Sequence, residues 1–403
     1  MEVIKGKSLK KIQPNTRYLA CTFYLEEIDV DSFVGCEFDN CSFRGSSVDI
    51  DLSNKKLDCI PHWIFHLTNL KNLNLSSNKI EEIPKEIGQL SSLEVLNLCN
   101  NKINSIPKEM KELFRLRTLN LSGNKIVKVK WIELDSLKVL KMSSNQIEKI
   151  PNEIGQLSSL EILDLSGNKI EHIPKEIGQL SSLVFVKLDK NRITKIPKEI
   201  SQLSKCIWLY LRNNKIAEMP KEIGQLSSLV ELLLDHNKIA GLPKEIGQLS
   251  SLVELRLDDN KIIEIPKEIG KLSSLVSLSL GTNKITKIPK EIGQLSFLEV
   301  LFLRNNQITK IPKEIGQLSS LTGLTLGINQ IKEIPKDINQ LTSLEELHLD
   351  NNKIAEIPKE IGLLPSLEYL TLYENMFIRI PRERGSYCSV SYRGNFSNTN
   401  SWR

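Results

Sequence analysis

The feature that most constrains the fold is an asparagine that recurs at a fixed spacing along most of the chain. Each step between successive copies is 23 residues, except one step of 21 residues from Asn124 to Asn145. A degenerate first copy has Lys55 at the asparagine position, so fifteen repeats cover residues 47–381. A fixed period of this length is typical of stacked repeats that share one continuous core. The other copies are Asn78, Asn101, Asn168, Asn191, Asn214, Asn237, Asn260, Asn283, Asn306, Asn329, Asn352 and Asn375.

Each repeat has a constant set of apolar positions. In one copy these framework residues are Leu160, Leu163, Leu165, Asn168, Ile170, Ile173, Pro174, Ile177, Gly178 and Leu180. The L-x-L segment has period 2, which predicts a strand whose leucines point inward and whose intervening residues point outward. The proline then starts a short helical turn, because its fixed φ already suits that geometry. A single repeat leaves both of its flat sides wet, so stacking is obligatory.

This pattern resembles the leucine-rich repeat family. The segment "IPKEIGQL" is similar to the Ras-group class of intracellular leucine-rich repeat proteins. The resemblance implies an α/β solenoid, a horseshoe with a parallel concave sheet and short helical or 3-10 turns on its convex side. It also implies scaffolding or signalling through a small GTPase or a phosphatase. Fold alone does not imply function, so the residues on the solvent face must carry that argument.

The two ends of the array need caps, because the end coils of a solenoid expose core. In residues 1–46 bulky side chains recur every five positions, a spacing that resembles pentapeptide repeats and predicts a small right-handed β-helix-like cap. Residues 382–403 carry no repeat, and we expect them to form a C-terminal cap and a disordered tail. The five-residue series is Tyr18, Phe23, Ile28, Phe33, Phe38, Phe43 and Val48.

Composition narrows the classes of function. Seven cysteines without paired spacing indicate reduced thiols and a reducing compartment. The chain start has no apolar signal region, and no run approaches 18 apolar residues. We therefore expect a soluble cytoplasmic monomer that binds no membrane. The net charge is only +5, with Lys and Glu interleaved, so we expect no nucleic-acid binding.

No catalytic or metal motif stands out. His62 and His66 have the i, i+4 spacing of a metal pair, but no HExxH pattern accompanies them, and Trp63 and Phe65 favour packing over the first coil. The chain has no P-loop, no G-x-S-x-G and no CxxC. The shortened repeat around Trp131 is interpreted as a packing adjustment. We expect no enzyme activity, no cofactor and no metal.

The outward strand positions differ between repeats and suggest where a partner binds. They are mostly small and polar in repeats two to four, whereas repeat eight carries Trp208, Tyr210 and Arg212. Exposed Trp, Tyr and Arg within a polar rim have the composition of a binding hot spot. The predicted partner-binding residues are Phe185, Lys187, Asp189, Trp208, Tyr210, Arg212, Glu231, Leu233, Asp235, Glu254, Arg256, Asp258, Phe302 and Arg304.

Stacking in register predicts which of these residues are neighbours. Phe185 is expected beside Trp208, Tyr210 between Lys187 and Leu233, and Arg212 between Asp189 and Asp235. A second cluster near the end of the array either extends this footprint or helps to cap the array. Its members are Val300, Phe302, Arg304, His348, Tyr369 and Tyr373.

The sequence therefore favours a non-enzymatic interaction module whose concave face binds a protein, centred on repeats seven to ten. Two alternatives from other classes stay open. One is a pathogen-type effector or decoy that acts in a host cell. The other is a surface or secreted adhesin, which the odd cysteine count and the absence of a signal pattern disfavour.

Overall fold

The computed structural model describes residues 2–24, 36–39, 41–44, 49–129, 134–376 and 389–391. The chain divides into two compact units, Met1–Arg192 (unit 1) and Ile193–Arg403 (unit 2), and each is described by itself. The unit boundary falls inside the predicted repeat array. The predicted domain boundaries near residues 46 and 381 lie outside the described residues, as does Trp131.

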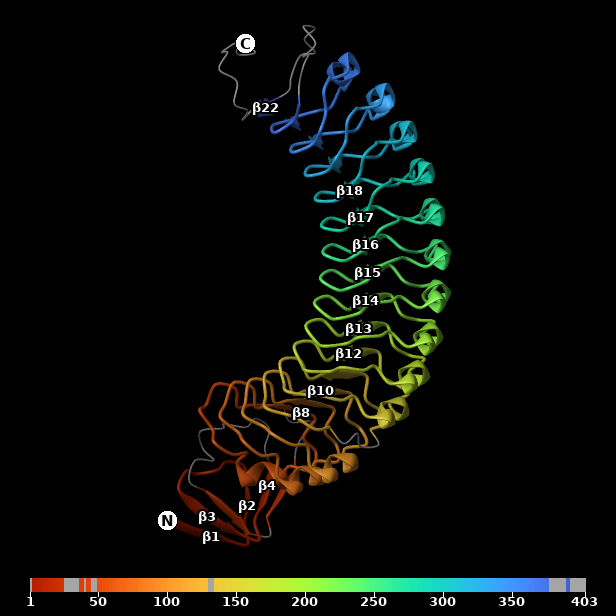
Figure 1. Cartoon of the computed structure of the whole chain (residues 1–403). Coiled ribbons are helices and arrows are strands. Elements are labelled where there is room, and N and C mark those ends of the chain that lie inside the picture. Colours follow the sequence, from red (N-terminus) through yellow and green to blue (C-terminus); the bar gives the residue numbers. More distant parts are fainter. Residues whose placement is uncertain are drawn as a thin grey trace. The chain divides into compact units, whose positions relative to one another are not determined.

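The N-terminal part of unit 1 consists of two small parallel sheets in the orders β1-β3-β5 and β2-β4-β6 (Figure 1). In the register of these sheets, Tyr18 lies opposite Phe38 and Phe23 lies opposite Phe43. The rings of Tyr18 and Phe23 are fully buried and meet edge to face at 5.0 Å. The strands are β1 (Glu2–Lys5), β2 (Ser8–Leu9), β3 (Thr16–Leu19), β4 (Thr22–Tyr24), β5 (Glu37–Asp39) and β6 (Ser42–Arg44).

Tyr18 and Phe23 of the five-residue series are therefore core residues of this part. Ile28, Phe33 and Val48 of the five-residue series lie outside the described residues. The likeness to pentapeptide repeats and the capping role therefore stay predictions.

The rest of unit 1 has one strand per repeat in a parallel sheet, and most repeats have a 3-10 helix on the other side of the coil (Figure 1). The strands are β7 (Asp49–Asp51), β8 (Asn72–Asn74), β9 (Val95–Asn97), β10 (Thr118–Asn120), β11 (Val139–Lys141), β12 (Ile162–Asp164) and β13 (Phe185–Lys187). The 3-10 helices are η2 (His62–His66), η3 (Lys85–Gln89), η4 (Lys108–Glu112), η5 (Asn152–Gln156) and η6 (Lys175–Gln179).

Unit 2 repeats the same coil. Its strands are β14 (Trp208–Tyr210), β15 (Glu231–Leu233), β16 (Glu254–Arg256), β17 (Ser277–Ser279), β18 (Val300–Phe302), β19 (Gly323–Thr325), β20 (Glu346–His348), β21 (Tyr369–Thr371) and β22 (Ser389–Ser391). Its 3-10 helices are η7 (Lys198–Gln202), η8 (Lys221–Gln225), η9 (Lys244–Gln248), η10 (Lys267–Lys271), η11 (Lys290–Gln294), η12 (Lys313–Gln317), η13 (Lys336–Gln340) and η14 (Lys359–Leu363). The predicted parallel sheet and 3-10 turns are confirmed in both units.

The recurring asparagine joins neighbouring coils through hydrogen bonds. Asn237 Nδ2 donates to the carbonyls of Leu211 and Leu234, both at 3.0 Å, and its Oδ1 accepts from the Ile216 amide at 3.0 Å. The amide side chain thus satisfies both buried backbone donors and buried backbone acceptors. These bonds fix the register of each coil on the next and hold the outward strand positions in rows.

The 3-10 helices begin after the predicted proline. Pro220 precedes η8, and its carbonyl accepts from the Ile223 amide at 3.1 Å. Glycine in these helices permits close stacking, because a Cβ on Gly224 would lie 2.8 Å from the Gln248 side-chain oxygen of the next coil and closer still to the Glu245 carbonyl. The tightly packed helix side supports the sheet that carries the candidate site.

Candidate functional site

The outward residues of the first strands of unit 2 form rows across the sheet. Trp208 pairs in register with Glu231, and Glu231 pairs with Glu254. A second row contains Tyr210, Leu233 and Arg256 in the same order. The inward residues of β14 are fully buried, whereas Trp208 and Tyr210 are half-buried. The predicted position of Leu233 beside Tyr210 is therefore confirmed, and the predicted position of Asp235 beside Arg212 stays a prediction.

Tyr210 is the centre of a fixed polar cluster. Its hydroxyl donates to Glu231 Oε2 at 2.6 Å, and the Arg212 guanidinium carbon lies 5.5 Å from its ring centroid. Burial raises the pKa of the Tyr210 hydroxyl, and the hydrogen bond to Glu231 raises it further. The ring, the carboxylate and the guanidinium hold one another in position, so this part of the surface is preorganised.

Two carboxylates lie along the next row of the same coils. The Asp258 amide donates to Asp235 Oδ1 at 3.3 Å, and the Gly281 amide donates to Asp258 Oδ1 at 2.7 Å. Burial raises the pKa of Asp235 to about 6, and the neighbouring Asp258 carboxylate contributes to the shift. Removing the Asp235 charge or pairing it with a cation would relieve this repulsion.

Three of the predicted site residues offer little surface. Leu233 is only 6% exposed and Asp235 only 7%, and Asp189 of unit 1 is also buried. For Leu233 the cause lies in the register, because Tyr210 and Arg256 flank it on the two neighbouring strands. The expectation that these three residues present exposed contact area is wrong.

Glu254 and Arg256 form an ion pair on β16. Glu254 therefore has its own partner on one side and the like-charged Glu231 on the other. Like charges directly opposite in a sheet are destabilising, and here the Tyr210 hydroxyl and Arg256 each offset part of this cost.

The sequence analysis missed a row of apolar residues that immediately precedes these strand positions. In unit 2 its members are half-buried and β-branched. The Val253 amide donates to the Val230 carbonyl and the Val276 amide to the Val253 carbonyl, both at 2.9 Å, so the row runs from coil to coil. The sequence contained a signal for this row, because one position of the repeat changes from charged to β-branched residues. We call this row the apolar stripe: Ile207, Val230, Val253 and Val276.

Phe185, Lys187 and Asp189 belong to β13 and the residue pair that follows it, in unit 1. Their predicted contacts with Trp208, Tyr210 and Arg212 join the two units and stay predictions.

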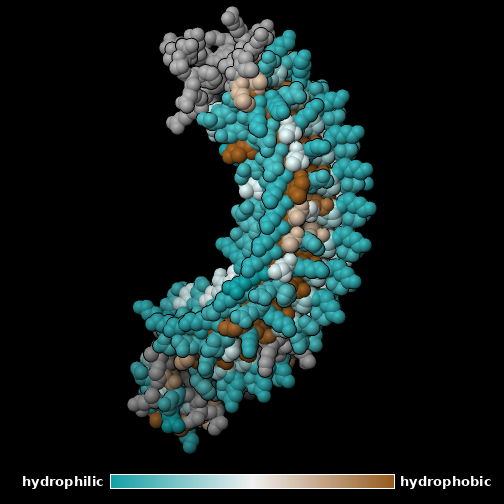
Figure 2. Space-filling model, viewed as in Figure 1, coloured by the Kyte–Doolittle hydropathy of each residue, from teal (hydrophilic) through white to brown (hydrophobic). Residues whose placement is uncertain are grey.

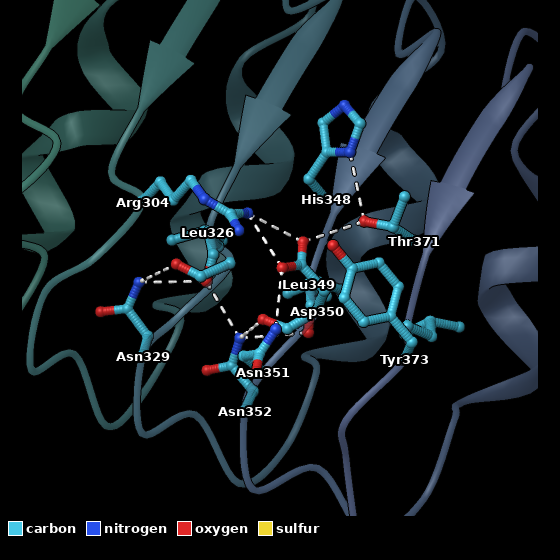
Figure 3. A network of polar contacts seen from close by, with 12 residues as sticks. Arg304, Leu326, Asn329, His348, Leu349, Asp350, Asn351, Asn352, Thr371 and Tyr373 are labelled. Carbon is cyan, nitrogen blue, oxygen red and sulfur yellow. Dashed lines mark hydrogen bonds and ion pairs between the residues drawn. The ribbon is translucent and has the colours of Figure 1, made fainter. Parts of the chain in front are cut away.

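The second predicted cluster centres on an ion pair that crosses two coils (Figure 3). Arg304 Nη1 lies 2.9 Å from Asp350 Oδ2, and the Asp350 side chain is only 2% exposed. The guanidinium passes over Gly327, where a Cβ would collide with it and lie 2.6 Å from Asp350 Oδ1. The glycine is therefore required for this contact.

Further donors hold the Asp350 carboxylate. Thr371 Oγ1 donates to Asp350 Oδ1 at 3.2 Å, and Asn351 Nδ2 donates to Oδ2 at 3.2 Å (Figure 3). Burial raises the pKa of Asp350, but the hydrogen bond from Asn351 and the Arg304 charge outweigh it and hold this pKa below its usual range. His348 Nδ1 lies 3.2 Å from Thr371 Oγ1 and extends the network.

Tyr373 lies next to this network (Figure 3), and Phe302 on β18 and Tyr369 on β21 are exposed aromatic residues of the second cluster. Figure 2 shows that the visible surface is mainly hydrophilic, with separate apolar patches between the polar side chains. The second cluster is thus a rigid polar network with Tyr373 next to it and two exposed aromatic residues on its strands.

At the first coil, Trp63 and Phe65 are buried, as the packing interpretation predicted, and the rings of His62 and His66 lie 5.5 Å apart. Within the described residues, no group of three or more His, Cys, Asp or Glu side chains is placed to hold a metal ion. In the same part of the chain, every helix is too short or too polar to cross a membrane.

The stacked coils, each with one strand and most with a 3-10 turn, define a solenoid repeat protein. Residues 129–207, 197–284 and 267–373 match the family described as leucine-rich repeat region, and residues 68–126 match leucine rich repeat. The chain belongs to the leucine-rich repeat family. A search of the curated protein sequences gave no significant match.

Solved structures show the same fold. A leucine-rich repeat protein of Leptospira interrogans is 36% identical, with a TM-score of 0.75, over 86% of this chain and 96% of that one. The Arabidopsis receptor kinase HAESA, in complex with the peptide hormone IDA and a co-receptor, is 28% identical, with a TM-score of 0.72, over 94% of this chain and 70% of that one. An internalin of Listeria monocytogenes is 25% identical, with a TM-score of 0.63, over 81% and 86%.

Proposed function

We propose that this protein is a non-enzymatic interaction module that binds a protein partner on the solvent face of its sheet, centred on β14–β17. The observation that carries the proposal is the Trp208, Tyr210 and Arg212 cluster. Trp208 and Tyr210 occupy the outward positions of β14, whose inward residue Leu209 is fully buried, and Tyr210 is fixed by Glu231. Arg212 follows two residues after Tyr210, with its guanidinium near the Tyr210 ring. Large, preorganised aromatic and arginine side chains of this kind dominate interface energies.

The comparisons support a protein as the ligand class. The similar structure of HAESA contains a peptide hormone and a co-receptor, which are polypeptide partners. A small GTPase or a phosphatase is implied only by the resemblance of the "IPKEIGQL" repeats to the Ras-group class.

We also propose a cytoplasmic location. Cys21, Cys59, Cys99 and Cys206 are free thiols. Burial raises the pKa of the Cys206 thiol to about 12, so this group stays protonated and unreactive within the core. A free, buried thiol suits a reducing compartment.

The test is a pull-down from cell extract with wild-type protein and a Trp208→Ala/Tyr210→Ala variant, read by quantitative mass spectrometry. Truncating both anchors is expected to weaken a true partner by at least about 2 kcal/mol, some thirtyfold in affinity. The matched control is Phe297→Ala/Leu363→Ala, which removes two exposed apolar side chains of unit 2 that lie outside the strands. Equal capture by all three baits would refute the assignment of the site.

A further inference from the structure

The apolar stripe ends after the coil of β17 and has two different flanks. The same position in the next four coils holds Glu299, Thr322, Glu345 and Glu368. One flank carries no acidic residue and consists of Lys205, Ser228, Ser251 and Ser274. The other flank is the row that contains Trp208, Glu231 and Glu254. An apolar stripe with one acidic side is asymmetric, so a partner must match it in chemistry and in direction.

The two glutamates on the acidic flank are held in place. Glu231 accepts the Tyr210 hydrogen bond at 2.6 Å, and Glu254 forms its ion pair with Arg256. Each carboxylate retains further lone pairs, because an ionised carboxyl accepts about four hydrogen bonds. At the outward positions of β14–β17 and the residues two places beyond, the carboxylates that reach the surface are Glu231, Glu254 and Asp258, and the guanidiniums are Arg212 and Arg256, because Asp235 is buried. Glu231 and Glu254 make this flank of the stripe acidic.

We propose that this surface binds an amphipathic helix of a protein partner. The apolar face of the helix covers the apolar stripe and packs against Trp208, and a lysine or arginine on one flank meets Glu231 and Glu254. This inference rests on the proposed function and names the chemistry of the partner. The like-charged pair is then explained, because a cation between the two carboxylates turns repulsion into attraction.

Spacing favours a helix over an extended segment. Neighbouring parallel strands lie about 4.7–4.9 Å apart, so the four members of the stripe span about 14 Å. Residues on one face of a helix recur every three to four positions at 1.5 Å per residue, or about 5.3 Å. Residues on one face of an extended strand recur at about 6.6 Å, which runs out of step with the stripe after two coils. A helix of about three turns therefore places one apolar side chain near each coil.

The test uses defined peptides and isothermal titration calorimetry. The probe is a capped alanine-based helix of about 15 residues, with leucine at every third or fourth position and lysines along one flank. One control peptide has glutamate in place of each lysine, and a second has the composition of the probe in scrambled order. The lysine peptide is expected to bind wild-type protein at least about tenfold more tightly than either control.

Variants locate the binding. Glu231→Gln/Glu254→Gln is expected to reduce the preference for the lysine peptide over the glutamate peptide to within about twofold. Val230→Ser/Val253→Ser is expected to weaken the binding of the lysine peptide and of the glutamate peptide by about the same factor. The matched control is Glu222→Gln/Glu245→Gln, which makes the same charge change in two 3-10 helices of unit 2, η8 and η9. This control is expected to keep the preference.

Equal affinity for the three peptides, or an equal loss in the η8/η9 control, would overturn the inference. Its failure can be told from failure of the proposed function. If the Trp208→Ala/Tyr210→Ala variant loses the cellular partner but wild-type protein shows no lysine preference, the surface binds a partner of other chemistry. If the preference is present but that variant keeps the partner, the proposed site of partner binding is wrong.

Discussion

Replacing one ladder asparagine in the middle of unit 2 is expected to destabilise the protein far more than replacing the last one. Asn237→Ala removes hydrogen bonds to the Ile216 amide and to the Leu211 and Leu234 carbonyls, and a longer one to the Asp235 carbonyl. Asn237 is buried, so water cannot replace the lost partner. Each orphaned buried group costs about 1–3 kcal/mol, and we expect a total loss of about 3–5 kcal/mol.

Asn375 makes equivalent bonds to the Ile354 amide and to the Leu349 and Leu372 carbonyls, but these are partly buried. Water can reach them, so Asn375→Ala is expected to cost only about 1 kcal/mol. Asn237→Asp provides a second control, because a carboxylate accepts from the Ile216 amide but cannot donate to the two carbonyls. Its cost should approach that of the alanine variant.

The assay is urea unfolding followed by circular dichroism, with each variant compared at a common temperature and pH. The energetic argument fails if Asn237→Ala and Asn375→Ala lower the stability equally. It also fails if Asn237→Asp is as stable as the wild type, since the two donated bonds would then be dispensable.

Four further predictions concern single features of the molecule. Leu209→Ala, at a fully buried position between the two half-buried aromatic residues, is expected to cost about 2–5 kcal/mol in urea unfolding, whereas Trp208→Ala should cost no more than roughly 1 kcal/mol; similar losses would mean that Trp208 is a core residue. Because the pKa of Asp235 is raised to about 6, the folded state binds the proton more tightly than the unfolded state, so stability falls as pH rises from about 4 to about 6. Asp235→Asn should remove this fall, which a series of melting curves would detect. Gly327→Ala should separate Arg304 from the buried Asp350 carboxylate and cost about 1–3 kcal/mol, and an Arg304→Ala/Gly327→Ala double variant should add little to either change alone. Finally, all seven cysteines should react with iodoacetamide after denaturation without reductant; two or more stoichiometric disulfides would contradict the cytoplasmic proposal and favour a surface protein.

The period of the sequence was sufficient to predict where each strand lies and which residues face inward. The L-x-L segment fixes the inward side of a strand because side chains alternate, as Leu209 between Trp208 and Tyr210 illustrates. The asparagine at a fixed offset is a residue that can both donate and accept, and Asn237 does both in the structure. These properties depend only on one repeat and its nearest neighbours, so the repeat pattern in the sequence is enough to predict them.

Exposure within the outward rows was less predictable. Leu233 and Asp235 occupy outward positions, but large or charged neighbours in adjacent coils cover them. Whether an outward side chain is open therefore depends on residues 23 positions away on both sides, not on its own position in the repeat. The apolar stripe could have been found from Val230 and Val253, because the sequence shows the change of residue type at that position.

The contact between Arg304 and Asp350 could not be predicted from the pairing of neighbouring coils. It joins residues two coils apart, and it depends on the glycine between them. The sequence analysis identified Arg304 as a surface residue but gave no reason to connect it with a buried carboxylate.

The ion pair from Arg304 to Asp350 also limits how this chain can change its length during evolution. Most bonds between coils, such as those of Asn237, link a coil to its immediate neighbours. Gain or loss of one whole 23-residue unit would leave such bonds intact, and it would move a recognition surface along the array by one step. Between β18 and β20 an inserted unit would instead separate Arg304 from its carboxylate and leave a buried charge uncompensated. Duplication of a repeat is therefore tolerated better between β14 and β17 than between β18 and β20. The apolar stripe can change its length in this way, whereas the ion pair between Arg304 and Asp350 keeps its own segment at a fixed length.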